Sequence, residues 1–113
     1  MDMEVIQTKV FEKVISALLN EEEYRQFEAT LVQNPGIGAI IPDSGGIRKM
    51  RWKRQGKGKR GGIRVIYYWM TSSFQILMLY AYSKSKQEDL SRNEIKVLKQ
   101  LVEEEIRYGR KNV

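Results

Sequence analysis

Apolar residues near the amino end of the chain recur at helical spacing and predict two helices. The first is expected over residues 9–19, because apolar side chains return at i, i+3, i+4 and i+7. A second helix should begin after Asn20, a common helix cap, where three glutamates meet the positive end of the helix dipole. It should end at Asn34-Pro35-Gly36, because proline cannot continue the hydrogen-bond ladder and glycine accepts a left-handed cap.

Alternating side chains predict strands further along the chain. Residues 3–8 alternate weakly and indicate a short edge strand or a lead-in. Stronger alternation covers residues 47–53, 63–70 and 74–83, and the second of these segments is rich in β-branched and aromatic residues. The short Thr71-Ser72-Ser73 connection favours an antiparallel hairpin between the last two. In the strand over 63–70, Val65 and Tyr67 should face one side of the sheet and Arg64 the other.

A capping box marks the start of a last helix. Ser91 and Glu94 have the spacing at which each side chain caps the other residue's backbone amide, and Leu90 with Ile95 makes a hydrophobic staple. The element order is therefore strand, helix, helix, three strands, helix, which predicts an α+β fold. A chain of 113 residues, 42% of them hydrophobic, is long enough for one core, so residues 1–113 should form a single domain.

The composition narrows the possible chemistry. The chain has no cysteine for disulfides or cysteine zinc sites, and no histidine, the usual general base and the commonest neutral metal ligand. We therefore expect no metal and no cofactor, and any catalysis must use lysine, arginine, tyrosine, serine or a carboxylate. Because the first residues lack a signal-peptide pattern and the apolar runs are too short to span a bilayer, we expect a cytoplasmic protein with no membrane partner.

Positive charge is concentrated in the middle of the chain. The net charge is +6, but residues 44–87 alone carry eleven lysines and arginines and no acid. Such a segment attracts polyanions, of which phosphate backbones are the commonest in a cytosol. A solvated basic face that only aids solubility is the alternative, and the complete absence of Asp and Glu from the segment weighs against it.

A glycine-rich basic loop joins two of the predicted strands. Residues 52–64 combine six cations with four glycines, so backbone amides can approach a ligand closely while the cations neutralise phosphate. The loop is not a P-loop, because strands flank it and no Ser or Thr follows a lysine at the required spacing. Taken alone it is a weak signal, since a solvated turn can have the same composition.

Cations and tyrosines near this loop suggest chemistry on RNA. Arg64 should lie on the open face of the sheet, and Lys84 and Lys86 could reach the same rim. In a cluster of cations a lysine becomes usable as a base, while arginine stabilises charge on a phosphoryl oxygen during attack by the adjacent 2′-hydroxyl. Phosphate binding without chemistry explains these residues equally well. Tyr80 and Tyr82, at a strand end, are the better candidates for stacking on bases, although core packing would account for many of the aromatic residues.

Four stretches of the chain resemble the HigB branch of the RelE toxin superfamily. They are Gly45-Gly46-Ile47-Arg48-Lys49-Met50-Arg51, Gly56-Lys57-Gly58-Lys59-Arg60-Gly61-Gly62-Ile63-Arg64-Val65-Ile66-Tyr67-Tyr68, Tyr80-Ala81-Tyr82-Ser83-Lys84, and Asp89-Leu90-Ser91 with Glu94. The resemblance implies a RelE-like fold: a small twisted antiparallel sheet of three or four strands, two N-terminal helices and one C-terminal helix. It implies a type II toxin that enters the ribosomal A site and cleaves mRNA without metal. The implied partner is a helix-turn-helix antitoxin of the HigA type.

The resemblance also implies roles for single residues. Lys57 and Lys59 would serve as base and electrostatic stabiliser and Arg64 as phosphate clamp. Lys84 and Lys86 stand near where relatives place a further arginine, so that assignment is looser. We expect the remaining cations of the segment and two tyrosines to bind substrate: Arg48, Arg51, Lys53, Arg54, Arg60, Tyr80, Tyr82 and Lys86. A tyrosine that some relatives carry near the last helix has no counterpart here, so Tyr80 or Tyr82 replaces it or the mechanism does without it.

Two other functions fit parts of the pattern. A non-catalytic RNA- or ribosome-binding module would need the same basic surface. A DNA-binding repressor is less favoured, because the basic residues fall on a loop and a sheet and no predicted helix is a basic recognition helix. The antitoxin could meet the acidic residues 21–23 and the apolar helix before them, but core packing explains these residues at least as well.

Overall fold

The computed structural model describes residues 3–54 and 62–108, and its main elements follow the expected order. The helices are α1 (Lys9–Leu18), α2 (Glu21–Gln33) and α3 (Arg92–Tyr108). The strands are β1 (Glu4–Gln7), β2 (Ala39–Ile40), β3 (Arg48–Lys53), β4 (Gly62–Met70) and β5 (Gln75–Ser83), with a short 3₁₀ turn, η2 (Thr71–Ser73), before β5. The α+β fold class is confirmed. Within this part of the chain, no helix has the length and apolar character needed to cross a bilayer.

The strands form one sheet in the order β1-β5-β4-β3-β2, which is larger than the expected sheet of three or four strands. The sheet is also mixed, because β1 runs parallel to β5, with Val5 opposite Ile76, while the other pairs are antiparallel. The sequence does not show this parallel pair, because its two strands lie far apart along the chain. β2 has only two residues in a glycine-rich loop, where no alternation can be recognised.

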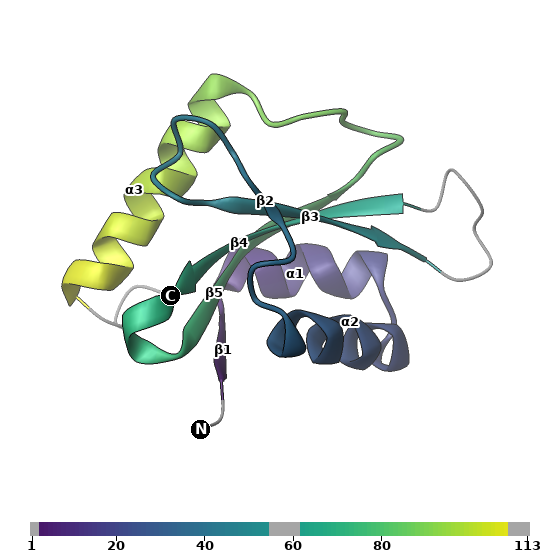
Figure 1. The fold of residues 1–113 in the computed structure, drawn as a ribbon. Helices are drawn as coiled ribbons and strands as arrows, with labels where there is room; N and C mark the ends of the chain where they lie inside the picture. Colours follow the sequence, from purple (N-terminus) through teal and green to yellow (C-terminus); the bar gives the residue numbers. More distant parts are fainter. Residues whose placement is uncertain (1–2, 55–61, 109–113) are drawn as a thin grey trace.

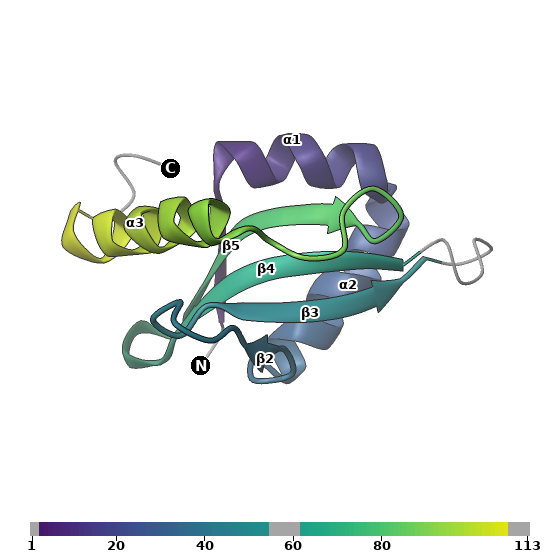
Figure 2. The same cartoon turned by 90° about the horizontal axis from the view of Figure 1, so that it is seen from above.

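Helices cover both faces of the sheet (Figures 1 and 2). α1 and α2 lie on one face, where Phe11 and Phe27 are buried in a cluster with Val65. α3 lies on the other face, where Val102 belongs to a second buried cluster with Ile66. Because Val65 and Ile66 fall in different clusters, the alternation expected for β4 is confirmed. α3 covers only part of its face, and the rest carries the polar residues described below.

The helix starts follow the capping signals in the sequence. Asn20 and Glu23 form a reciprocal capping box at α2, in which the Asn20 side chain accepts a hydrogen bond from the Glu23 amide at 2.8 Å. Ser91 and Glu94 form the same pair at α3, where the Ser91 amide donates to Glu94 Oε1 at 2.8 Å and the Glu94 amide donates to Ser91 Oγ at 3.1 Å. The second box fixes the point at which the segment after β5 enters α3.

One buried tyrosine forms hydrogen bonds with the backbone of the connection between α2 and β2. The Tyr67 hydroxyl donates a hydrogen bond to the Pro35 carbonyl at 2.7 Å and accepts one from the Gly38 amide at 2.8 Å. Burial is the main reason that the pKa of this phenol is raised, so it stays protonated and keeps both bonds. A Cβ atom on Gly38 would lie 2.8 Å from that hydroxyl and 3.0 Å from the Lys49 carbonyl oxygen. Only glycine therefore fits at this position without displacing β3 or β4.

A β-bulge in β5 changes which face its last residues occupy. Tyr67 pairs with Met78 and Ile66 pairs with Tyr80, so Leu79 is the extra residue of the bulge. Before the bulge, Met78 faces the α1–α2 side; after it, strict alternation would place Tyr80 on that side too. The extra residue instead turns Tyr80 and the following Tyr82 toward the opposite side of the sheet. The bulge thereby brings both tyrosines to the face that carries Arg64.

Candidate functional site

Arg64 lies on the part of the sheet face that α3 does not cover. It is on the middle strand β4, between Arg51 on β3 and Tyr82 on β5, which are its cross-strand partners. Arg64 points to the face opposite α1 and α2, as expected. Here the segment 84–91 runs back over the sheet from β5 to α3 (Figure 2). Arg64, Arg51 and Tyr82, with the segment above them, form what we call the Arg64 site.

Arg64 and Tyr82 are buried with few polar partners. Arg64 is 8% exposed, and within the described residues its guanidinium donates one long hydrogen bond, 3.4 Å, to the carbonyl of the preceding Ile63. Within residues 3–54 and 62–108 it forms no ion pair. Tyr82 is 5% exposed, and its hydroxyl has no hydrogen-bond partner in the same part of the chain. Burying a charge or a hydroxyl without a partner costs free energy, about 1–3 kcal/mol for a neutral group, and proteins usually avoid it.

The electrostatics of the site keep the Tyr82 phenol protonated. Burial raises the pKa of Tyr82 to about 12, and the nearby Asp89 carboxylate acts in the same direction, while the charge of Arg64 opposes them. Near neutral pH this hydroxyl is therefore a hydrogen-bond donor and not a base. A buried guanidinium and a buried hydroxyl on adjacent strands together offer donors that suit an anion with several acceptor oxygens, such as a phosphate.

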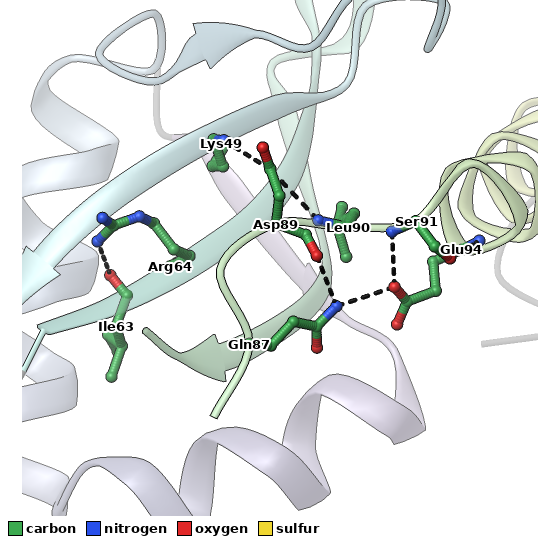
Figure 3. A network of polar contacts seen from close by, with 8 residues as sticks. All are labelled: Lys49, Ile63, Arg64, Gln87, Asp89, Leu90, Ser91 and Glu94. Carbon is green, nitrogen blue, oxygen red and sulfur yellow. Dashed lines mark hydrogen bonds and ion pairs between the residues drawn. The ribbon is translucent and has the colours of Figure 1, made fainter. Parts of the chain in front are cut away.

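The segment above the site is held by a small polar network (Figure 3). Asp89 Oδ1 lies 2.9 Å from Lys49 Nζ, and it also accepts a hydrogen bond from the Leu90 amide at 3.2 Å. Gln87 Nε2 donates to the Asp89 carbonyl at 2.9 Å and to Glu94 Oε1 at 2.8 Å. The hydrogen bond from Lys49 is the main reason that the pKa of Asp89 is lowered. Because the Asp89 side chain is largely exposed, this ion pair contributes at most about 1 kcal/mol and a competing anion can break it.

The structure brings several of the expected residues together. Arg51 lies directly across from Arg64, and Lys53 shares its strand face. Tyr80 lies beside Tyr82, with ring centroids 6.1 Å apart and planes inclined by 32°. Lys84 and Lys86 are exposed just beyond β5, where the Lys84 amide bonds to the Gly62 carbonyl at the start of β4. Lys57, Lys59 and Arg60 lie outside the described residues.

Two expected substrate-binding arginines lie elsewhere. Arg48 is on the opposite face of β3, where its guanidinium donates to the Gly38 carbonyl at 2.7 Å and lies 5.9 Å from the centre of the Trp69 ring. Arg54 also points away from the site and donates to the Leu18 carbonyl at 3.4 Å. Both follow from alternation along β3, which turns these two side chains toward α1 and α2. We therefore leave Arg48 and Arg54 out of the candidate site.

Other polar residues of the site were not singled out from the sequence. Lys49 alternates in phase with Arg51, so the strand pattern placed it on the same face. Asp89 and Gln87 come from a connection without periodicity, and their position depends on folding across the sheet. Among residues 3–54 and 62–108, no three His, Cys, Asp or Glu side chains gather as potential ligands of a metal ion.

Replacing Tyr82 with phenylalanine should weaken RNA binding without lowering the stability of the fold. The change removes a buried hydroxyl without a partner, so the free energy of unfolding should stay the same or rise, by up to about 1 kcal/mol. Affinity for a short RNA should fall about 5-fold, because one neutral hydrogen bond is worth about 1 kcal/mol. Urea unfolding and fluorescence anisotropy measure the two effects. Tyr67→Phe is the matched control: it breaks two buried hydrogen bonds, so it should lower stability and leave RNA affinity unchanged.

Comparisons with known proteins bear on the fold and the family. Residues 3–112 match the family model described as the RelE toxin of the RelE/RelB toxin–antitoxin system. A double arginine-to-alanine mutant of the E. coli toxin RelE, solved in the free state, superposes with a TM-score of 0.58. The match covers 78% of this chain and 90% of that one, at 13% sequence identity. An identity this low supports the shared fold alone, whereas the family match spans nearly the entire chain.

Proposed function

This chain belongs to the RelE toxin family of toxin–antitoxin systems, and we propose that it stops translation by cleaving mRNA in the ribosomal A site. The observation that carries the proposal is the pair of buried donors, Arg64 and Tyr82, on neighbouring strands of a cation-rich face. A phosphate of an RNA backbone offers acceptors to both once the segment 84–91 above them moves aside. The family also implies an antitoxin partner, and its assignment as a HigA-like helix-turn-helix protein of the HigB branch is part of the proposal.

In the proposed reaction, bonds are made and broken only in the RNA that the ribosome presents, and side chains of this chain move the protons. A base removes the proton from the 2′-hydroxyl, and the resulting oxygen attacks the adjacent phosphorus. The bond from phosphorus to the 5′-oxygen breaks, that oxygen takes up a proton, and a 2′,3′-cyclic phosphate and a 5′-hydroxyl end remain. Arg64 and Tyr82 donate hydrogen bonds to the phosphoryl oxygens as negative charge increases there, which lowers the barrier.

Other residues complete the proposed site. Lys57 and Lys59 are the candidates for base and charge stabilisation on the strength of the sequence alone. Lys84, exposed at the end of β5, is the candidate for a further phosphate contact, with Arg51, Lys53, Arg60 and Lys86 binding the flanking backbone. Tyr80 offers a ring for base stacking beside Tyr82.

A translation extract distinguishes this function from a non-catalytic RNA- or ribosome-binding module. Added toxin should produce new internal 5′ ends on a reporter message, detected by primer extension, and the same message without ribosomes should stay intact. Inhibited translation with an intact message would instead identify the binding module. Cleavage of the bare message at the same rate would remove the ribosome from the proposal while keeping the nuclease.

A further inference from the structure

A long groove lies beside the Arg64 site, between the β2–β3 region and the first half of α3. It has a volume of about 1040 Å³, and one wall consists of residues 39–43. The floor includes Lys49 and Arg51 of β3, and α3 supplies the other wall. Because Arg51 also pairs with Arg64, the groove borders the proposed active site. Figure 1 shows the connection between β2 and β3 reaching toward α3.

Cations dominate the charged residues of this groove. Arg92, Lys96 and Lys99 recur on one face of α3, four and three residues apart, and join Lys49 and Arg51. Against these five cations the lining has two carboxylates, Asp43 and Asp89. Among the residues that line the groove, Lys49 and Asp89 form an ion pair, and the other four cations form none with a described carboxylate.

The apolar part of the lining is aliphatic. Ile40, with 56% of its surface exposed, stands with Ile41 and Pro42 on one wall, and Leu90 and Ile95 line the opposite side. No described residue that lines the groove is aromatic. Proteins that hold single-stranded RNA usually stack bases on aromatic rings, which this groove lacks. Aliphatic walls with a cationic rim fit a polypeptide that carries apolar side chains on one face and carboxylates on the other.

We propose that this groove binds an acidic amphipathic segment of the antitoxin, and this inference rests on the antitoxin partnership in the proposed function. Asp89 already shows that a carboxylate fits here, with its Oδ1 2.9 Å from Lys49 Nζ. A segment bound in the groove would place further carboxylates against Arg51 and the α3 cations. It would neutralise charge at the mouth of the Arg64 site and block the approach of an RNA backbone, which is how it inhibits the toxin.

Charge reversal on α3 tests the proposal. Arg92→Glu with Lys96→Glu changes the first residue of α3 and the exposed residue one turn later. Lys9→Glu with Lys13→Glu changes the same two positions of α1, also exposed, on the other side of the sheet. Each toxin variant is purified with the protein encoded beside it, separated from it and titrated back by biolayer interferometry. We expect the α3 variant to bind roughly 30-fold more weakly and the α1 control to bind like the wild type.

The outcomes separate this inference from the proposed function. Growth arrest by the α3 variant should persist and should no longer be relieved by antitoxin co-expression. Unchanged antitoxin affinity, or an equal loss in both double variants, would overturn the docking site. Loss of mRNA cleavage with unchanged antitoxin affinity would assign the groove to RNA instead.

Arg92→Gln with Lys96→Gln, which adds no negative charge, should give a smaller loss of antitoxin affinity than the charge reversal. Thermal unfolding confirms that each variant folds. A wild type that binds the antitoxin but cleaves no message would contradict only the nuclease function.

Discussion

Arg64→Ala should lower the rate of mRNA cleavage by at least about 100-fold, the usual cost of removing a donor that stabilises charge in a transition state. The guanidinium is buried on the middle strand without a carboxylate partner in the described part of the chain, so an RNA phosphate would be its main acceptor. Primer extension on a reporter message, sampled over time in a translation extract, measures the rate. Arg25→Ala, which removes one exposed positive charge from α2, should leave the rate unchanged.

A lysine at the same position sharpens this test. Arg64→Lys keeps the charge but loses the planar fork that can bind two phosphoryl oxygens at once, so it should recover only a small part of the rate. If Arg64→Ala cleaves as fast as the wild type while remaining folded, Arg64 is not the phosphate clamp. If both variants unfold, Arg51→Ala, which changes the exposed cation directly across from Arg64, still tests by its RNA affinity at rising salt whether this face binds phosphate.

Gly38→Ala should destabilise the protein by about 3 kcal/mol, the largest effect on stability that we expect from adding one methyl group. The new Cβ would lie 2.8 Å from the Tyr67 hydroxyl and 3.0 Å from the Lys49 carbonyl oxygen, so either the phenol or the backbone of β3 must move. Overpacking of this kind costs about 1–3 kcal/mol, and loss of the buried hydrogen bonds at Tyr67 adds to it. Urea unfolding followed by circular dichroism gives the free energy.

Gly36→Ala provides the matched control two residues earlier. There the added Cβ would meet the nearest atom of Trp69 at 3.5 Å, an ordinary van der Waals contact. This variant should be close to the wild type in stability. Equal destabilisation by the two substitutions would show that loss of backbone flexibility, and not the contact with Tyr67, explains the need for glycine at position 38.

The candidate site could be foreseen only in part. The acid-free segment 44–87 and the placement of Arg64 opposite Val65 predicted which face of the sheet to consider for phosphate binding, and the structure places Arg64 on that face. The same alternation rule, applied to β3, would have excluded Arg48 and Arg54 and included Lys49, because these residues alternate between the two faces. The remaining part of the site depends on contacts between distant residues. The Lys49–Asp89 pair joins positions 40 residues apart, and no local pattern predicts it.

The sequence by itself determined the order of the main elements, the helix starts at Asn20 and Ser91, and the concentration of positive charge. These features depend on residues close together in the chain, because periodicity and capping act over a few positions. Only the tertiary structure decided the parallel β1–β5 pair, the bulge at Leu79 and the groove beside α3. The bulge shows the reason: one extra residue in β5 reverses the face of every later side chain, and a bulge is defined by the pairing with β4, not by the residues of β5 alone. The position of Tyr82 next to Arg64 is therefore a property of the folded sheet.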